Sequence, residues 1–271
     1  MKHPIKDGKR NTQEKTWLLS TKLKTLTLTE LNQYTVIVIT NIYAPNNRTK
    51  KMVESFERFG YEMAILNAEW PNGRIFNNLA QCYKRAATGH ETFLYSDAGD
   101  SFCQKPFTVP NDRLIWSTEK QCFPHVELAE QYPNPRTKTD WKYLNNGGYC
   151  GSLELMNEFS DKYIGKLKLD DNCQHETMVA FLQAKKDGFP IYLDYKCKIF
   201  QTIAFDPAKP NKGEPIDRAS YSIHRDDKGN PKYTGTDFAI KNGLVVNKMT
   251  KTTPSILHGN GQTPMEWIYQ L

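Results

Sequence analysis

Apolar and polar residues alternate in blocks between residues 35 and 95, and these blocks predict strand, helix, strand, helix and strand. Residues 35–40 form an unbroken β-branched run, which is what a strand buried on both faces requires. Helical spacing follows over residues 49–59, a second strand over 61–66, a second helix over 75–87 and a third strand over 93–95. Because crossovers between such strands are right-handed and make the sheet parallel, the pattern predicts an α/β fold.

The order of elements becomes mixed after residue 100. We expect strands over residues 113–117 and 191–194, a further element beginning near residues 148–151, and a helix over residues 176–186. Residues 206–235 are rich in proline, glycine, lysine and aspartate, which indicates long loops or a hairpin. The sequence shows no internal repeat, and it lacks the glycine-rich fingerprints of Rossmann dehydrogenases and P-loop NTPases.

Composition argues against a membrane-spanning protein. The chain has 271 residues, a mass of 31.3 kDa and a mean hydropathy of −0.67, and it has no apolar run of about 18 residues. The first 30 residues carry charge but lack the apolar stretch of a secretory signal, so we expect a cytoplasmic protein. The six cysteines occur singly, without a CxxC pair, which favours free and mostly buried thiols in a reducing compartment.

The net charge of +6 is unevenly distributed. Residues 1–33 hold seven lysines and arginines against three acidic residues, and residues 185–251 hold thirteen against eight. These segments carry +4 and +5, so the rest of the chain sums to −3 (+6 less +4 and +5). We predict a basic N-terminal arm over residues 1–33 and a single domain over residues 34–271.

Two carboxylates three residues apart, Asp97 and Asp100, follow directly after the strand expected at residues 93–95. The carboxyl ends of parallel strands are where open α/β folds bind ligands. Hard divalent cations that act on phosphates take one or two carboxylates together with substrate oxygens. Gly99 permits the tight turn that would aim both side chains at one point. The motif therefore indicates either a divalent-cation site or an ordinary Asp/Gly surface turn.

Three further segments carry candidate chemistry, and each has a structural alternative. His258, before a Gly-Asn-Gly turn, could complete a metal site through neutral imidazole or form a structural hydrogen bond. Asn145 and Asn146, followed by two glycines, could contact sugar hydroxyls or form a plain turn. Asp170 and Asp171 could bind an acceptor hydroxyl, offset positive charge in a transition state, or cap the following helix.

Taken in chain order, these segments resemble the glycosyltransferase domain of the procollagen lysyl hydroxylases, which is related to the collagen galactosyltransferases. The resemblance extends from about residue 35 to residue 261. Its blocks are Asp97-x-x-Asp100, Trp116-Ser-Thr-Glu119 with Cys122-Phe-Pro124, Leu144-Asn-Asn-Gly-Gly148, Asp170-Asp171, Leu193-Asp194 with Ile199-Phe-Gln201, and His258-Gly-Asn-Gly261. It implies a GT-A-type, Rossmann-like α/β fold with a mostly parallel central sheet.

The resemblance also implies roles for single residues. It assigns three ligands for Mn²⁺ (or Mg²⁺) on the diphosphate of a UDP-sugar, namely Asp97, Asp100 and His258. The positions that it assigns to donor binding are Thr40, Asn41, Arg74, Tyr95, Ser96, Asn145 and Gly261. The positions that it assigns to catalysis are Asp170, Asp171 and Asn146, and those on the acceptor side are Glu119 and Asp171. Residues 171–175 depart from the family, which carries an acidic run there.

The implied reaction is a metal-dependent sugar transfer that retains the anomeric configuration, with same-face attack by the acceptor hydroxyl. In the basic segment 185–251, aromatic residues such as Tyr195, Tyr221, Tyr233 and Phe238 are interleaved with the charges. Because this composition suits a polyanionic acceptor, we predict transfer to a hydroxymethylated pyrimidine base in DNA, as in bacteriophage-type modifying enzymes. The alternatives are an enzyme acting on hydroxylysine or another protein hydroxyl, an inactive sugar-nucleotide-binding module, and a plain nucleic-acid-binding protein.

Overall fold

The computed structural model of the chain describes residues 36–41, 46–66, 90–164, 173–204, 224–225, 228, 231–232, 237–261 and 263–270. The predicted arm at 1–33, the predicted helix at 75–87 and most of the segment 206–235 lie outside these residues. Within the described ranges, no helix has both the length and the apolar character needed to cross a membrane.

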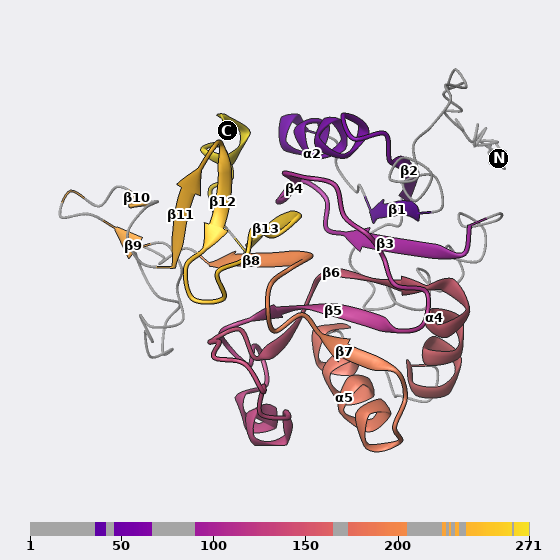
Figure 1. The fold of residues 1–271 in the computed structure, drawn as a ribbon. Helices are drawn as coiled ribbons and strands as arrows, with labels where there is room; N and C mark the ends of the chain where they lie inside the picture. The colour runs from indigo at the N-terminus through magenta and orange to yellow at the C-terminus, as the bar shows by residue number, and fades with distance from the viewer. Residues whose placement is uncertain are drawn as a thin grey trace, which may run out of the picture.

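A six-stranded sheet forms the centre of the protein, with the strand order β2-β1-β3-β6-β5-β7 (Figure 1). Its strands are β1 (Val36–Asn41), β2 (Glu62–Leu66), β3 (Thr92–Ser96), β5 (Leu114–Glu119), β6 (Tyr143–Ser152) and β7 (Ile191–Leu193). β1 pairs in parallel with β2 and β3, β5 pairs in parallel with β7, and β6 runs antiparallel between β3 and β5. The predicted α/β class with a mostly parallel central sheet is confirmed.

Helices cover both faces of this sheet (Figure 1). One face carries α2 (Asn47–Glu57), and the other carries α4 (Leu153–Phe159), the π-helical turn η2 (Ser160–Ile164) and α5 (Cys173–Lys186). Because alternate residues of a strand face opposite sides, Val38 and Leu94 pack with Phe56 of α2, whereas Ile39 and Phe93 pack in the cluster with α4, η2 and α5. Both faces of β1 are therefore apolar, as its β-branched run predicts.

The helix α2 begins at residue 47, two residues before its predicted start, because Asn46 caps it. Asn46 Oδ1 accepts hydrogen bonds from the backbone N–H groups of Arg48 (2.8 Å) and Thr49 (3.1 Å). Thr49 Oγ1 in turn accepts from the Asn46 N–H at 2.8 Å, which completes a capping box. The sequence pattern shows the apolar face of a helix but not the capped turn before it, and α5 likewise begins three residues earlier than predicted.

A second sheet of three strands has the order β4-β13-β8 and consists of β4 (Ser101–Cys103), β13 (Ile256–Asn260) and β8 (Phe200–Ala204). The remaining strands form two hairpins, β9 (His224–Arg225) with β10 (Pro231–Lys232), and β11 (Phe238–Lys241) with β12 (Leu244–Asn247). β13 pairs antiparallel with β4, and the register sets His258 opposite Ser101. This pairing positions the candidate site, because β4 directly follows the Asp97–Asp100 turn.

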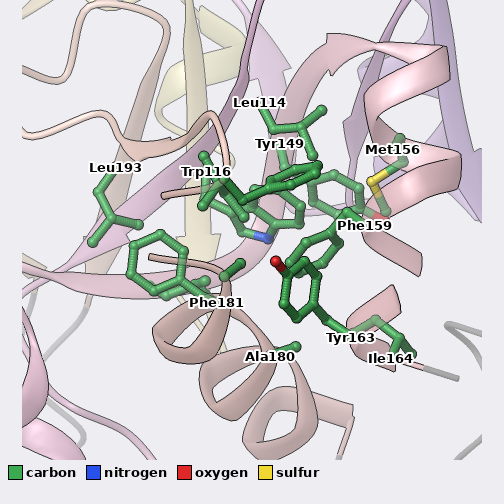
Figure 2. Close-up of a cluster of buried hydrophobic side chains, with 14 of the residues drawn as sticks. Leu114, Trp116, Tyr149, Met156, Phe159, Tyr163, Ile164, Ala180, Phe181 and Leu193 are labelled. Carbon is green, nitrogen blue, oxygen red and sulfur yellow. The ribbon is translucent and has the colours of Figure 1, made fainter. Parts of the chain in front are cut away.

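Aromatic rings are stacked on the side of the sheet that faces α4 and α5 (Figure 2). Tyr149, on the middle strand β6, lies 4.8 Å from Trp116 at an interplanar angle of 8° and 4.7 Å from Tyr95 at 22°. Phe159 of α4 packs against Trp116 with a centroid distance of 5.3 Å. The stack connects three neighbouring strands, so it fixes their side chains relative to one another.

The block Leu193-Asp194 with Ile199-Phe-Gln201 has a structural explanation. The buried carboxylate of Asp194 accepts hydrogen bonds from the backbone N–H groups of Lys198 (3.0 Å), Ile199 (2.7 Å) and Phe200 (3.0 Å). These bonds hold the loop between β7 and β8, and hence the strand next to β13. Asp194 therefore acts on the fold rather than on a ligand.

Two sequence interpretations in this part of the fold are wrong. Residues 143–149 do not form a plain turn, because they belong to β6 and pair with both β3 and β5. Phe238 is not available to contact an acceptor, because it is buried and packs against Trp141. The prediction of free, buried thiols is confirmed for the four cysteines that the structure describes in full, namely Cys103, Cys122, Cys150 and Cys197.

Candidate metal centre

Asp97, Asp100 and His258 bring their ligand atoms together at the carboxyl end of β3. The two aspartates lie in the turn between β3 and β4, and His258 lies on β13. His258 Nε2 is 3.6 Å from Asp97 Oδ2 and 3.7 Å from Asp100 Oδ1, and one ligand atom of each residue lies within 4.8 Å of the others. The structure thus brings together the three residues that the sequence suggests as metal ligands.

The donor set and its surroundings fit a hard divalent cation. An ion bound 2.0–2.6 Å from each ligand would hold its ligand atoms roughly 3 to 5 Å apart, and the observed distances lie in that range. Asp100 Oδ1 and His258 Nδ1 are buried and have no hydrogen-bond partner among the described residues. Carboxylate oxygens suit Mg²⁺ and Mn²⁺, and neutral imidazole is a common metal ligand.

The electrostatics of the cluster also favour a cation. Burial raises the pKa of Asp100 to about 7; the neighbouring His258 opposes this rise, and the charge of Asp97 adds to it. Without a cation, Asp100 therefore takes up a proton near neutral pH. Because a metal ligand must be deprotonated, a bound cation would compete with that proton, and cation binding should strengthen as the pH rises through 7.

The floor of the cluster is the backbone of β6 at Gly147. A Cβ atom built there would lie 2.0 Å from His258 Cε1 and 2.4 Å from His258 Nε2, so the imidazole rests directly on the glycine. The Gly147 carbonyl also accepts a hydrogen bond from the Asp97 N–H at 3.0 Å. The missing side chain at position 147 is therefore what lets the histidine approach the aspartate turn.

A chain of polar side chains extends from this floor to Glu119. Asn145 Oδ1 accepts from the Gly147 N–H (3.0 Å), Asn145 Nδ2 donates to Asn260 Oδ1 (2.9 Å), and Asn260 Nδ2 donates to Glu119 Oε2 (2.8 Å). Burial raises the pKa of Glu119 to about 8, although its hydrogen bonds with Asn145 and Asn260 oppose this rise. The network connects Glu119, predicted on the acceptor side, with the strand that carries His258.

The buried Glu119 makes stability depend on pH. Since its pKa is about 8 in the folded protein and 4.5 ordinarily, the folded state holds one proton more than the unfolded state between these values. The free energy of unfolding should therefore fall as the pH rises through this window, by at most about 1.4 kcal/mol per pH unit from this group. We expect Glu119→Gln to remove this contribution. Urea unfolding of wild type and variant at several pH values measures the free energy of unfolding. If this free energy changes with pH equally in both proteins, the prediction is contradicted.

Asn146 faces away from this network toward α5. Its Oδ1 accepts from Trp116 Nε1 (3.3 Å), and its Nδ2 donates to Thr177 Oγ1 (3.1 Å) of α5. Asn145 and Asn146 are neighbours on β6, so they extend to opposite sides of the strand. Only Asn145 joins the network of Glu119.

Thr40 and Ser96 lie at the carboxyl ends of the neighbouring strands β1 and β3, on the α2 face of the sheet. Both are fully buried, and their Oγ atoms have no hydrogen-bond partner among the residues that the structure describes. Leaving a buried hydroxyl unpaired costs about 1–3 kcal/mol. These two hydroxyls are therefore good candidates for ligand contacts.

Tyr95 has a contact that the sequence reasoning missed. Its ring is buried on the opposite face, in the aromatic stack, and its hydroxyl donates to Asp97 Oδ1 at 2.8 Å. Because side chains alternate between the two faces of a strand, Tyr95 and Asp97, which are two residues apart, fall on the same side of β3. This pattern could have predicted the contact. A donor-binding role for Tyr95 remains a prediction.

The C-terminal segment makes further contacts that the sequence did not predict, and these contacts hold α2 and the Asp97–Asp100 turn. Arg48, in the first turn of α2, pairs with Glu266 at 2.6 Å. Tyr269, in the short helix η4 (Ile268–Gln270), donates to the Gly99 carbonyl at 3.3 Å. The turn that carries the two aspartates is thus held from β6 on one side and from the C-terminal segment on another.

The other predicted site residues are only partly described. Asn41 is the last residue of β1, and Gly261 follows β13 with a φ of +59°, a conformation that favours glycine. Arg74, Asp170 and Asp171 lie outside the described residues. The 3-10 helix η1 (Val126–Gln131) follows the strand that carries Glu119 and contains none of the predicted positions.

The fold and the site define an α/β domain with a candidate divalent-cation centre at the carboxyl end of its central strands. Comparison with known proteins agrees: residues 90–209 match the family described as PLOD GT domain. These residues, somewhat less than half of the chain, are thus similar to the glycosyltransferase domains of the PLOD family.

Several curated proteins are similar to the chain. Human multifunctional procollagen lysine hydroxylase and glycosyltransferase LH3 is 24% identical over 259 residues, covering 88% of this chain and 31% of that protein. Uncharacterized protein R699 of Acanthamoeba polyphaga mimivirus is 27% identical over 155 residues, covering 57% of this chain and 26% of that protein. The chain thus spans about a quarter to a third of the length of these relatives.

One solved structure that matches is of a glycosyltransferase involved in the glycosylation of the major capsid of PBCV-1. It is 13% identical, with a TM-score of 0.39, and the match covers 62% of this chain and 84% of that chain.

Proposed function

We propose that the chain is a divalent-metal-dependent glycosyltransferase that moves a sugar from a UDP-sugar to an acceptor hydroxyl with retention of anomeric configuration. The observation that carries the proposal is the convergence of Asp97, Asp100 and His258 in a domain that matches the PLOD GT family. We place Mn²⁺ or Mg²⁺ on these three residues and the donor diphosphate on the ion.

The chemistry follows from where charge develops. When bound, the cation would act as a Lewis acid that offsets the charge of the departing diphosphate. Asp97, Asp100 and His258 would hold it at the carboxyl end of β3, while the buried hydroxyls of Thr40 and Ser96 would contact the nucleotide. Asn41, Arg74 and Gly261 complete the proposed donor site.

Polar groups of β6 and the following segment would face the reacting sugar. We place Asn145 beside the donor and Asn146 at the reaction centre, on opposite sides of β6. Asp170 and Asp171 would offset the positive charge that builds at the anomeric carbon, and Glu119 and Asp171 would serve the acceptor. Asn146 supports this arrangement through its hydrogen bond to Thr177, which lies close after the two aspartates in the chain.

For the acceptor we favour a hydroxylysine-type protein hydroxyl over a hydroxymethylated base in DNA. The name of LH3 describes a procollagen lysine hydroxylase and glycosyltransferase. The DNA hypothesis depends on aromatic residues interleaved with basic ones, and Phe238 is buried in the core while the Tyr195 hydroxyl donates to the Pro133 carbonyl. The buried ring of Phe238 cannot stack on a base.

The test offers several UDP-sugars with Mn²⁺ to a hydroxylysine peptide and to hydroxymethylated DNA. We expect UDP release that EDTA abolishes, and a hexose or pentose increment on the peptide by mass spectrometry. An increment on DNA alone would overturn the acceptor proposal but not the glycosyltransferase. No UDP release from any donor, with or without acceptor, would overturn the enzyme and leave the inactive sugar-nucleotide-binding module.

A further inference from the structure

We infer that Tyr95 is a positioning residue that holds Asp97 as a one-oxygen ligand and thereby favours small octahedral cations over Ca²⁺. The inference rests on the proposed metal centre. It concerns Tyr95, which contacts a proposed ligand, and not the three proposed ligands themselves. It also predicts which cations the site prefers.

The two oxygens of Asp97 have different surroundings. Oδ1 accepts the Tyr95 hydroxyl at 2.8 Å, and Oδ2 lies 3.6 Å from His258 Nε2, on the side where the three ligand groups converge. The Asp97 side chain is 41% exposed, so solvent alone would leave its carboxylate free to rotate. The phenol therefore selects the orientation in which Oδ2 faces the cation position.

Tyr95 can fix the carboxylate because its own ring is fixed. The ring is 6% exposed and stacks on Tyr149, which stacks on Trp116 in the cluster of Figure 2. In the sheet, Tyr149 pairs with both Tyr95 and Trp116, so the three side chains sit at one level of neighbouring strands. The hydroxyl is therefore held by the core of the domain and not by the exposed turn.

This geometry has a consequence for the choice of metal. Ca²⁺ takes six to eight oxygen ligands and readily accepts bidentate carboxylates, whereas Mg²⁺ demands a near-octahedral shell with one oxygen from each carboxylate. Mn²⁺ also forms octahedral oxygen sites. Because the phenol donates to Oδ1, bidentate binding by Asp97 would compete with this partly buried hydrogen bond. The chain's own tyrosine thus disfavours Ca²⁺ more than Mn²⁺.

The experiment measures cation affinity directly. Free Mn²⁺ is quantified by electron paramagnetic resonance during titration of the full chain, and Ca²⁺ affinity is obtained by competition. Tyr95→Phe keeps the ring stack and removes only the hydroxyl. The matched control is Tyr163→Phe, which removes a similar hydrogen bond from a buried tyrosine to Asp187 Oδ2 (3.0 Å) away from the site.

We expect Tyr95→Phe to weaken Mn²⁺ binding roughly 10- to 100-fold, the usual effect of losing a group that orients a metal ligand. Ca²⁺ binding should weaken less, so the preference for Mn²⁺ over Ca²⁺ should fall, while Tyr163→Phe leaves both affinities unchanged. Thermal unfolding of the two variants controls for a general loss of stability, which would not alter the ratio of the two affinities.

The outcomes separate the inference from the proposed function. If wild type binds Mn²⁺ and Tyr95→Phe binds both cations as the control does, the inference is overturned and the metal centre stands. If both affinities fall equally, Tyr95 positions Asp97 but the selectivity part is overturned. If wild type binds no Mn²⁺, or Asp97→Asn binds as well as wild type, the metal centre and the inference fall together.

Discussion

Asp97→Asn is expected to lower the rate of sugar transfer by about a thousandfold, which corresponds to about 4 kcal/mol of transition-state stabilisation. The amide has nearly the shape of the carboxylate but no negative charge, and its nitrogen cannot bind a cation. It would also place an N–H₂ group against either the Tyr95 hydroxyl or His258, since both oxygens of Asp97 have such neighbours. The cation, and with it the neutralisation of the leaving diphosphate, would be lost.

The measurement is the rate of UDP release under saturating Mn²⁺, with Asp112→Asn as the control. Asp112 is an exposed aspartate that pairs with Arg113 outside the site, so the same chemical change there should leave the rate unaltered. A rate for Asp97→Asn within a few-fold of wild type would show that the carboxylate holds no essential cation.

Gly147→Ala is expected to reduce both Mn²⁺ affinity and transfer by about a hundredfold, because a displacement of about 1 Å in a catalytic group has an effect of that size. The added Cβ would overlap the His258 ring, with built distances of 2.0 to 2.4 Å, so the imidazole must move away from the aspartates. The pairing of Gly148 with β3 and of Asn145 with β5 flanks this position, so we expect the main chain on either side to retain its place.

The control for this substitution is Gly60→Ala. Gly60 has a φ of +79° and no atom within 4 Å of a built Cβ, so the variant should lose about 1 to 2 kcal/mol of stability through backbone strain alone. It should keep full Mn²⁺ binding. If Gly147→Ala binds Mn²⁺ as tightly as Gly60→Ala does, the contact between Gly147 and His258 has no role in the site.

The parts of the fold that depend only on neighbouring residues could be predicted from the sequence. The β-branched run of β1 and the turn after β3 are local, so residues 35–40 and the aspartate pair could be placed from their neighbours alone. His258 could not, because more than half of the chain separates it from Asp100. Its position depends on the register of β13 against β4. Its neighbours in the sequence left a metal ligand and a structural hydrogen bond as alternatives, and the family resemblance favoured the ligand.

The segment 143–149 shows why local propensity fails. Asparagines and glycines are poor strand residues, yet they occupy the middle of the central sheet. The glycines are there because Gly147 lies under His258 and Gly148 under the Phe200 ring, at 2.6 Å from a built Cβ. Tertiary contacts from β13 and β8 therefore decide the conformation, and these are not visible in a window of neighbouring residues.

The antiparallel pairing of β4 with β13 also orders events during biosynthesis. A nascent chain that has passed residue 100 displays two carboxylates but no imidazole, and the third ligand emerges only with β13. All three residues of the candidate centre come together only once β13 has paired with β4. A nascent chain that ends before β13 would hold only the two carboxylates of the candidate centre.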